Sequence, residues 1–186
     1  MLRKLVLLMA LGIASPPAFG AEVGGVKLDD KLSLGGQELV LNGAGIRTKV
    51  MFKVYVGSLY VPAKANNAAA VYTKAPRRVQ LNMLRDVGAD QMIEALVDGL
   101  KQANSAADAA TVKAQTDQLA SIMKSIGQLK EGNVLTFDFV DDSTKVGLNG
   151  AMKGSIPGDG FNKALMNAWL GDNPVQSDLK KAMLGG

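Results

Sequence analysis

The chain has 186 residues, with 21 lysines and arginines against 17 acidic residues, and it contains no histidine and no cysteine. Those absences exclude a Ser-His-Asp triad, a cysteine nucleophile, a disulfide and the usual zinc and haem ligand sets. We therefore expect no cofactor and no metal. Any acid–base chemistry would fall to Asp, Glu, Lys, Tyr or Arg side chains.

The N-terminus has the layout of a secretory signal peptide. Arg3 and Lys4 precede an apolar run from Leu5 to Ile13, which Ser15-Pro16-Pro17 ends before the small residues Gly20-Ala21. The run is too short to span a bilayer, since a helix needs about 20 apolar residues to do so. We predict a signal peptide at 1–21 and a single domain at 22–186, located in a bacterial periplasm without an integral membrane span after cleavage. The alternative is an uncleaved membrane anchor.

Removing this segment also lowers the charge of the chain. Arg3 and Lys4 account for two basic residues, so the formal net charge of +4 falls to about +2 in the mature domain. No cluster of Lys and Arg with interleaved aromatic residues remains. We therefore do not expect nucleic acid as a partner.

The first half of the domain is rich in strand signals. A polar lead-in, 22–30, is followed by a hairpin of Lys31–Leu34 and Glu38–Leu41 around Gly35-Gly36. Asn42-Gly43-Ala44-Gly45 predicts the next turn, and Met51–Val61 predicts a long buried strand. A half-buried strand is expected over Arg78–Leu84, because apolar and polar residues alternate there.

The second half adds helices and two more hairpins. Helices are expected from Gly88, from Ser105 to Ile126 with Gly127 as the C-terminal glycine, over Phe161–Trp169 and over Asp178–Leu184. Strands over Val134–Val140, Thr144–Leu148 and Met152–Ile156 are joined at 141–143 and 149–150. This order predicts an α+β fold, an antiparallel sheet packed by helices on one face.

Arg47 lies where the predicted glycine turn meets the long strand. An unpaired buried charge is costly, so this arginine must either reach solvent or hold an anion. It is thus either a partly exposed arginine that closes a turn or part of an anion site.

Three segments carry a family resemblance. They are Gly43-x-Gly45-x-Arg47 with Lys53-x-Tyr55-x-x-x-Leu59-Tyr60-Val61, then Met83-Leu84-Arg85-Asp86-Val87, then Trp169-Leu170-Gly171-Asp172-Asn173-Pro174-Val175 before Ser177-Asp178-Leu179-Lys180. Together they resemble the chalcone-isomerase-like family, in particular its bacterial exported branch, over nearly all of the chain after residue 24. The resemblance implies an open-faced β-sandwich with a ligand cleft between sheet and helices.

The resemblance does not extend to the polar residues of the plant enzymes. Their arginine, which stabilises a phenolate-type anion, falls on Arg47, and their first threonine falls at or near Tyr55. Their lysine, tyrosine, asparagine and last threonine fall on Met83, Met92, Gly99 and Ala168. Because methionine, glycine and alanine side chains donate no hydrogen bond to an oxyanion, we expect no chalcone isomerisation.

Family members that bind fatty acids hold the carboxylate with an arginine and a nearby tyrosine. By this resemblance we expect Arg47 and Tyr55 to bind a small apolar carboxylate, with Met83, Met92 and Trp169 beside its apolar part. The residues alone also fit simpler roles, since methionines pack in cores and a strand tyrosine can bond to backbone or water.

Two further functions stay open at this point. One is an isomerase or intramolecular lyase that acts on an enone-like substrate, with Arg47 stabilising an oxyanion. The other is a cell-envelope interaction module with a vestigial cleft.

Two other clusters of charge have structural interpretations. Arg85 and Asp86 are adjacent at a strand-to-helix junction, which favours a local ion pair. Asp138, Asp141 and Asp142 lack the glycine and distal glutamate of a calcium loop, so they predict a solvated hairpin turn.

The signal peptide yields a direct prediction. The mature chain should begin at Ala21 or Glu22, because the basic start, the apolar run and the small residues form one export signal. Intact-mass measurement of the protein recovered from the periplasm checks this. A mature mass that includes residues 1–20 would contradict it.

Overall fold

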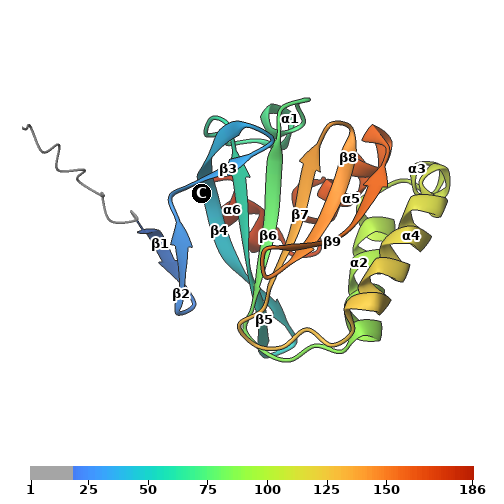
Figure 1. The fold of residues 1–186 in the computed structure, drawn as a ribbon, viewed down its shortest axis with the longest axis horizontal. Coiled ribbons are helices and arrows are strands. Elements are labelled where there is room, and N and C mark those ends of the chain that lie inside the picture. The colour runs from blue at the N-terminus through green and yellow to red at the C-terminus, as the bar shows by residue number, and fades with distance from the viewer. Residues whose placement is uncertain (1–18) are drawn as a thin grey trace, which may run out of the picture.

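The computed structural model describes residues 19–186, so residues 1–18 of the predicted signal peptide lie outside the described part. Its centre is a curled seven-stranded antiparallel sheet in which each strand pairs with its neighbour in sequence (Figure 1). The strands are β3 (Lys31–Leu34), β4 (Gln37–Lys49), β5 (Phe52–Val61), β6 (Arg77–Met83), β7 (Val134–Val140), β8 (Ser143–Leu148) and β9 (Ala151–Pro157).

Helices cover one face of this sheet. They are α1 (Ala68–Val71), α2 (Ala89–Ala103), α3 (Ala106–Thr111), α4 (Lys113–Ile126), α5 (Asp159–Leu170) and α6 (Ser177–Met183). α6 packs on β4, α5 on β8 and α4 on β9, while α2 packs against α4 and α5. The main hydrophobic core lies between these helices and the sheet, which confirms the predicted α+β architecture.

The N-terminal segment forms a hairpin, and the prediction of a polar lead-in at 22–30 is wrong. β1 (Phe19–Val23) pairs with β2 (Val26–Asp29) around Gly24-Gly25, which both have positive φ. This hairpin packs on the outer face of the sheet, where Leu28 joins a second apolar cluster. Cleavage after Ala21 would leave the pairs Glu22–Lys27 and Val23–Val26, and the cleavage site itself stays a prediction.

The other predicted turns and caps show how local chemistry sets element ends. Gly35-Gly36, Asp141-Asp142 and Asn149-Gly150 all have positive φ, as two-residue hairpin turns require. The Ser105 hydroxyl accepts from the Asp108 amide at 3.0 Å and begins α3. The predicted single helix from Ser105 to Ile126 is interrupted at Val112, where one residue leaves helical geometry and separates α3 from α4.

The predicted turn at Asn42–Gly45 is wrong, because β4 continues through it. Gly43 and Gly45 face α6, and a Cβ on Gly43 would collide with the Ala182 carbonyl oxygen, while one on Gly45 would lie 2.7 Å from the Ala182 Cβ. The glycines therefore allow a close approach of helix to strand rather than a reversal of the chain. Next to them, the buried Asn42 amide donates to the Met183 carbonyl at 2.8 Å.

The reversal between β4 and β5 occurs at Val50-Met51 instead. Lys49 pairs with Phe52, so the loop has two residues, and Val50 has a φ of 59°. A β-branched residue in this left-handed region costs about 1–2 kcal/mol. Both loop side chains are almost fully exposed, Val50 at 86% and Met51 at 84%.

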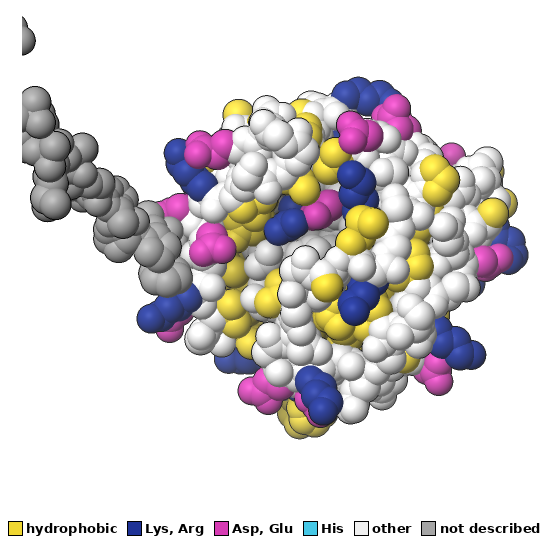
Figure 2. Space-filling model, viewed as in Figure 1, with side chains coloured by type: hydrophobic (Ala, Val, Ile, Leu, Met, Phe, Trp, Pro, Cys, Tyr) yellow, Lys and Arg dark blue, Asp and Glu magenta, His cyan; other side chains and the backbone are white. Residues whose placement is uncertain are grey.

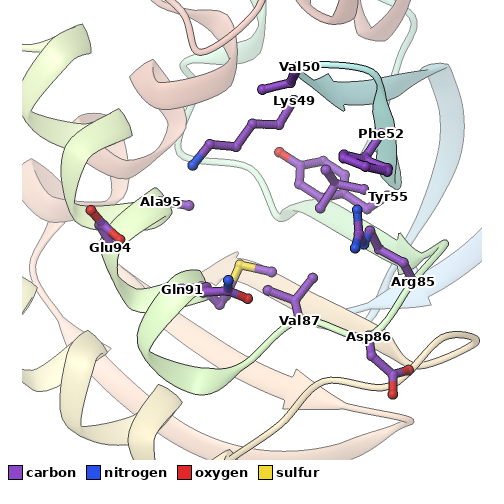
Figure 3. A pocket seen from close by; sticks show the side chains of 12 residues that line it. Lys49, Val50, Phe52, Tyr55, Arg85, Asp86, Val87, Gln91, Glu94 and Ala95 are labelled. Carbon is purple, nitrogen blue, oxygen red and sulfur yellow. The ribbon is translucent and has the colours of Figure 1, made fainter.

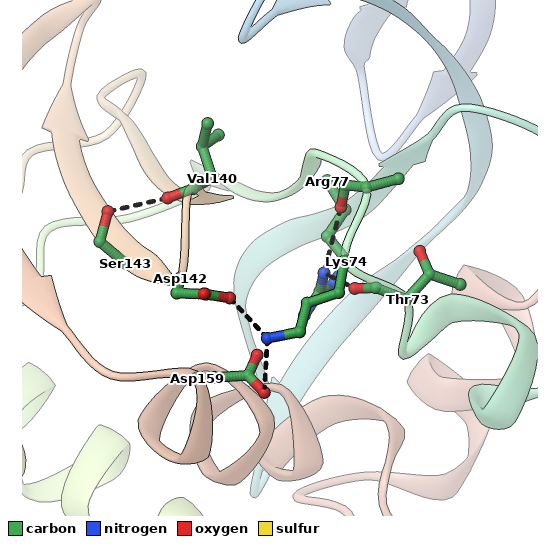
Figure 4. A network of polar contacts seen from close by, with 8 residues as sticks. Thr73, Lys74, Arg77, Val140, Asp142, Ser143 and Asp159 are labelled. Carbon is green, nitrogen blue, oxygen red and sulfur yellow. Dashed lines mark hydrogen bonds and ion pairs between the residues drawn. The ribbon is translucent and has the colours of Figure 1, made fainter.

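The opposite end of the sheet holds a buried arginine, Arg77, which forms no ion pair with a carboxylate of residues 19–186 (Figure 4). Arg77 donates to the carbonyls of Thr73 and Ala75, and its guanidinium lies 5.5 Å from the centre of the Phe139 ring. Burial lowers the pKa of Arg77. Nearby, Lys74 bridges Asp142 at the β7–β8 turn to Asp159 at the start of α5. These exposed ion pairs contribute little energy, and they mark where helix and hairpin meet.

Two sequence-based interpretations of charged residues differ in outcome. Asp141 and Asp142 form the predicted exposed hairpin turn, whereas Asp138 lies within β7 and forms a two-pronged ion pair with Arg78, so its predicted place in the solvated turn is wrong. Arg85 and Asp86, in contrast, do not pair with each other. Arg85 stacks 4.5 Å from the centre of the Phe52 ring, and Asp86 accepts from the Glu131 amide at 2.8 Å. The expected local ion pair is wrong because each side chain finds a partner across the fold.

Within residues 19–186, no helix has the length and apolarity needed to cross a membrane.

The packing of α6 on β4 predicts a sensitive glycine. Gly43→Ala should lower the free energy of unfolding by about 1–3 kcal/mol, since its methyl group meets a backbone carbonyl that cannot rotate away. Gly160→Ala is the matched control, because nothing lies within 4 Å of its Cβ position in the first turn of α5. Urea unfolding measures both, and equal stabilities of the two variants would contradict the close approach.

Candidate functional site

Three predicted site residues form a row across the sheet. Arg47 on β4 is the cross-strand partner of Tyr55 on β5, and Tyr55 is the partner of Met83 on β6. Directly opposed residues of antiparallel strands project from the same face. All three therefore belong to the helix-covered face.

The helices bring the other two predicted residues to this row. Trp169 on α5 donates its indole N–H to the Tyr55 hydroxyl oxygen at 3.1 Å and lies against the Phe137 ring. Met92 on α2 belongs to the same core cluster. Tyr55, Met83, Met92 and Trp169 are all buried.

Arg47 is half-buried and is bonded to neutral groups. Its Nη1 donates to the Thr48 carbonyl at 2.8 Å and to the Gln176 side-chain oxygen at 3.2 Å. Gln176 also accepts from the Thr48 amide and donates to the Ile46 carbonyl. Among the described residues, no carboxylate forms an ion pair with Arg47. Arg47 thus lies inside β4, attached to the segment before α6, and does not close a turn.

The environment of Tyr55 keeps its phenol neutral. Burial raises the pKa of Tyr55, and the hydrogen bond from Trp169 and the positive charge of Arg47 oppose this only in part. Because the hydroxyl oxygen already accepts from Trp169, its proton is available to donate. Tyr55 is therefore an oriented hydrogen-bond donor beside a cation.

A cavity of about 380 Å³ opens next to Tyr55 (Figure 3). It lies between the β4–β5 hairpin, the segment after β6 and the first turns of α2. Its lining is mostly apolar, with Val54, Val87, Met92 and Ala95 among the contributors. Figure 3 shows the Lys49 amine and the Tyr55 hydroxyl both directed into this space.

The cavity includes Tyr55 and Met92 of the predicted set but not Arg47, Met83 or Trp169. Met83 and Trp169 are packed behind Tyr55 in the core, where they position it. Sequence reasoning missed Lys49, Phe52 and Arg85, which line the mouth. If the sequence analysis had predicted a strand through Arg47, the alternation of side chains along a strand would have placed Lys49 on the same face of the sheet as Arg47.

A second hollow, of about 550 Å³, lies between α2, α3 and α4. Alanines contribute much of its wall, and its charged side chains include Lys113 and Asp117, which pair with each other at 2.6 Å. It contains none of the predicted site residues, so the cavity beside Tyr55 is the better candidate.

Comparison with known proteins agrees with this arrangement. A family model described as chalcone isomerase-like matches residues 20–185. The chain belongs to the chalcone isomerase-like family. No curated protein matches the sequence at a significant level.

Among solved structures, the crystal structure of a fatty-acid binding protein of Arabidopsis thaliana, AtFAP1, is similar to this chalcone isomerase-like chain. It superposes with a TM-score of 0.67 at 13% sequence identity, over 86% of this chain and 92% of the plant chain. At this identity the similarity establishes the shared fold.

The buried tyrosines predict how stability depends on pH. Burial raises the pKa of all three tyrosines of the chain, to about 12 for Tyr60 and for Tyr72. An unfolded tyrosine titrates near pH 10, so the folded state binds more protons above that pH. The stabilisation from neutral tyrosines should be complete below pH 10 and be lost as pH rises to about 12.

Tyrosinate absorbance near 295 nm measures this directly, with the protein unfolded in urea as the control. The native protein should lag the unfolded protein between pH 10 and about 12. A tyrosine that ionises near pH 10 in the native protein would contradict the burial of these phenols.

Proposed function

We propose that this chalcone isomerase-like protein binds a small apolar carboxylate, of the fatty-acid type, in the cavity beside Tyr55 and does not catalyse a reaction. The observation that carries the proposal is the buried, neutral Tyr55 hydroxyl, oriented by Trp169 at the wall of an apolar cavity. A carboxylate placed there would accept from the phenol while its chain contacts apolar side chains.

The charged groups near Tyr55 favour an anion. Lys49 points into the cavity, and Arg47 lies next to Tyr55 on the neighbouring strand. The acceptors that hold Arg47 now are a backbone carbonyl and an amide oxygen, both neutral. Arg47 does not line the cavity, so a carboxylate bonded to Tyr55 would reach it only by replacing the Gln176 oxygen. Hydrogen bonds to a carboxylate are about twice as strong as those to neutral acceptors, which favours this exchange.

The size of the cavity favours a short chain. Ligand sites typically enclose about 300–1,000 Å³, and this cavity, at about 380 Å³, is near the lower end. Met92 in its wall is a flexible side chain that adapts to an apolar ligand. The similar plant structure, that of a fatty-acid binding protein, supports the same class of ligand.

The positions at which the plant enzymes carry polar groups support a non-catalytic role. A Cβ on Gly99 would lie 3.5 Å from the Ala168 Cβ and 2.8 Å from a Val175 methyl group, so this place is occupied by close helix packing. Met83 is buried behind Tyr55. The side chains of Met83, Met92, Gly99 and Ala168 supply no hydrogen-bond donor at these positions. The predicted export signal makes the periplasm the proposed location.

The binding role is tested at Arg47 and Tyr55. Arg47→Ala should weaken binding of a medium-chain fatty acid such as dodecanoate by about 1.5–3 kcal/mol, and Tyr55→Phe by about 0.5–1.5 kcal/mol. Arg47→Lys should restore only part, since an ammonium lacks the planar fork. Isothermal titration calorimetry gives these affinities.

Gln176→Ala is the matched control. It removes the hydrogen bond that Arg47→Ala also removes, together with the two bonds from Gln176 to the backbone of β4, but it keeps the cation. Each bond that is lost lowers the stability by about 0.5–1.5 kcal/mol. Its affinity should stay near that of the wild type. If Arg47→Ala lowered the melting temperature while affinity was unchanged, Arg47 would be purely structural. Turnover of a chalcone above the uncatalysed rate would contradict the non-catalytic role.

A further inference from the structure

The tip of the β4–β5 hairpin exposes consecutive apolar side chains. Val50 is 86% exposed, Met51 84% and Phe52 55%, and they account for three of the four large exposed hydrophobic residues in the described part of the chain. Figure 2 shows hydrophobic side chains projecting at the lower edge of the molecule, where Figure 1 places the start of β5. Scattered apolar residues are common on surfaces, whereas a contiguous projecting group indicates an interaction site.

The stability of the fold does not explain why Val50 and Met51 occupy this loop. Val50 has a φ of 59° at the first position of a two-residue hairpin loop, where glycine is favoured. Glycine would remove both the backbone strain and the exposed side chain. The other two-residue hairpins of the sheet use Gly35-Gly36, Asp141-Asp142 and Asn149-Gly150, which suit positive φ. The β4–β5 tip alone among them combines strain with exposed apolar side chains.

Basic residues surround the tip. Lys49 and Lys53 flank it in sequence, and the guanidinium of Arg85 lies over the Phe52 ring at 4.5 Å. Within residues 19–186, none of these three cations takes part in an ion pair. The acids of the cavity wall, Asp86 and Glu94, lie away from Val50 on the segment after β6 and on α2 (Figure 3).

The tip also forms the mouth of the cavity. Lys49, Val50 and Phe52 line it from the hairpin side, opposite α2. A surface that contacts the tip therefore also faces the entrance of the cavity.

We propose that the β4–β5 tip docks on an anionic membrane surface, with Val50 and Met51 inserted among the acyl chains and Lys53 and Arg85 at the level of the headgroups. Apolar side chains ringed by Lys and Arg are the combination that binds anionic bilayers at their interface. This proposal goes beyond ligand binding and does not depend on it, because the tip contacts the membrane whether or not the cavity is occupied.

The shape of the tip favours a membrane over a protein partner. A stable protein interface buries about 800 Å² on each partner with complementary shape. Three side chains on a projecting hairpin supply a small convex surface, which suits a fluid bilayer that needs no preformed pocket. A second copy of this chain or a protein partner is the competing occupant, and the experiment below separates them.

Vesicle co-sedimentation tests the docking. Wild-type protein should sediment with vesicles of equal parts phosphatidylglycerol and phosphatidylcholine, and much less with pure phosphatidylcholine. Val50→Gly combined with Met51→Ser should lower the partition coefficient at least about tenfold, from the lost apolar burial. Lys53→Gln should lower it about fivefold on anionic vesicles only. All proteins carry the same N-terminus, which is verified by intact mass, so that differences in vesicle binding arise from the substitutions in the hairpin.

Met152→Ser is the matched control and should sediment like the wild type. Met152 is 68% exposed on β9, separated from the β4–β5 hairpin by β6, β7 and β8. Both variants are expected to stay folded, since they change exposed side chains and the glycine relieves strain. Circular dichroism spectra and melting temperatures confirm the fold.

A probe of local polarity gives a second measurement. The chain has no cysteine, so Met51→Cys and Met152→Cys each accept one environment-sensitive fluorophore at a defined position. Anionic vesicles should shift the emission of the probe at 51 to the blue and leave that at 152 unchanged.

The proposal is overturned by equal sedimentation of the wild type and the double variant, or by equal shifts at positions 51 and 152. It is also overturned if the wild type ignores anionic vesicles and instead forms a dimer that the double variant loses in sedimentation velocity. Loss of fatty-acid binding with intact vesicle binding would affect the proposed ligand alone.

Discussion

The close packing of α6 against β4 is the constraint on which the site depends. Gly43 and Gly45 remove the side chains that would hold the helix away, and polar groups then join the two elements at both ends. Asn42 bonds to the carbonyl of Met183, and Gln176 bonds to the backbone of β4 on both sides of Arg47. These contacts fix the position of α6 relative to β4, and they thereby set the orientation of the Arg47 side chain.

This arrangement separates the tasks of the residues around Tyr55. Met83 and Trp169 are core residues, and their contribution is to hold the phenol in place. The space that a ligand can enter lies on the other side of Tyr55, toward α2 and the β4–β5 hairpin. The molecule thus has a rigid wall built from sheet and α5, and an entrance built from a strained two-residue loop. The sheet and α5 thus support the fold, whereas the β4–β5 loop forms the entrance to the cavity.

The sequence predicted the local features well and the long-range ones poorly. Strand alternation, the paired-glycine turn at Gly35-Gly36 and the Ser105 cap depend on neighbours in the chain, and all were correct. Gly43 and Gly45 are wrongly predicted to form a turn, because what requires glycine there is the close packing of α6, which follows about 140 residues later in the sequence. With the turn predicted there, Met51 becomes the first residue of the predicted strand, so the reversal at Val50-Met51 is not recognised and Lys49 is missed. Arg47 and Tyr55 were found together through the resemblance, whereas the cavity that makes Tyr55 accessible required coordinates.

The contact between β4 and α6 joins segments that are far apart in the sequence, and this has a consequence for folding. Its hydrogen bonds link residues 141 and 129 positions apart, Asn42 with Met183 and Arg47 with Gln176. Contacts of such separation form late, because the entropy of closing a long loop opposes them until other structure has shortened it. During synthesis, β4 is made well before its partner helix α6, because residues 50–176 separate the two elements. The chain can therefore fix Arg47 in place only after the segment that carries Gln176 and α6 is available.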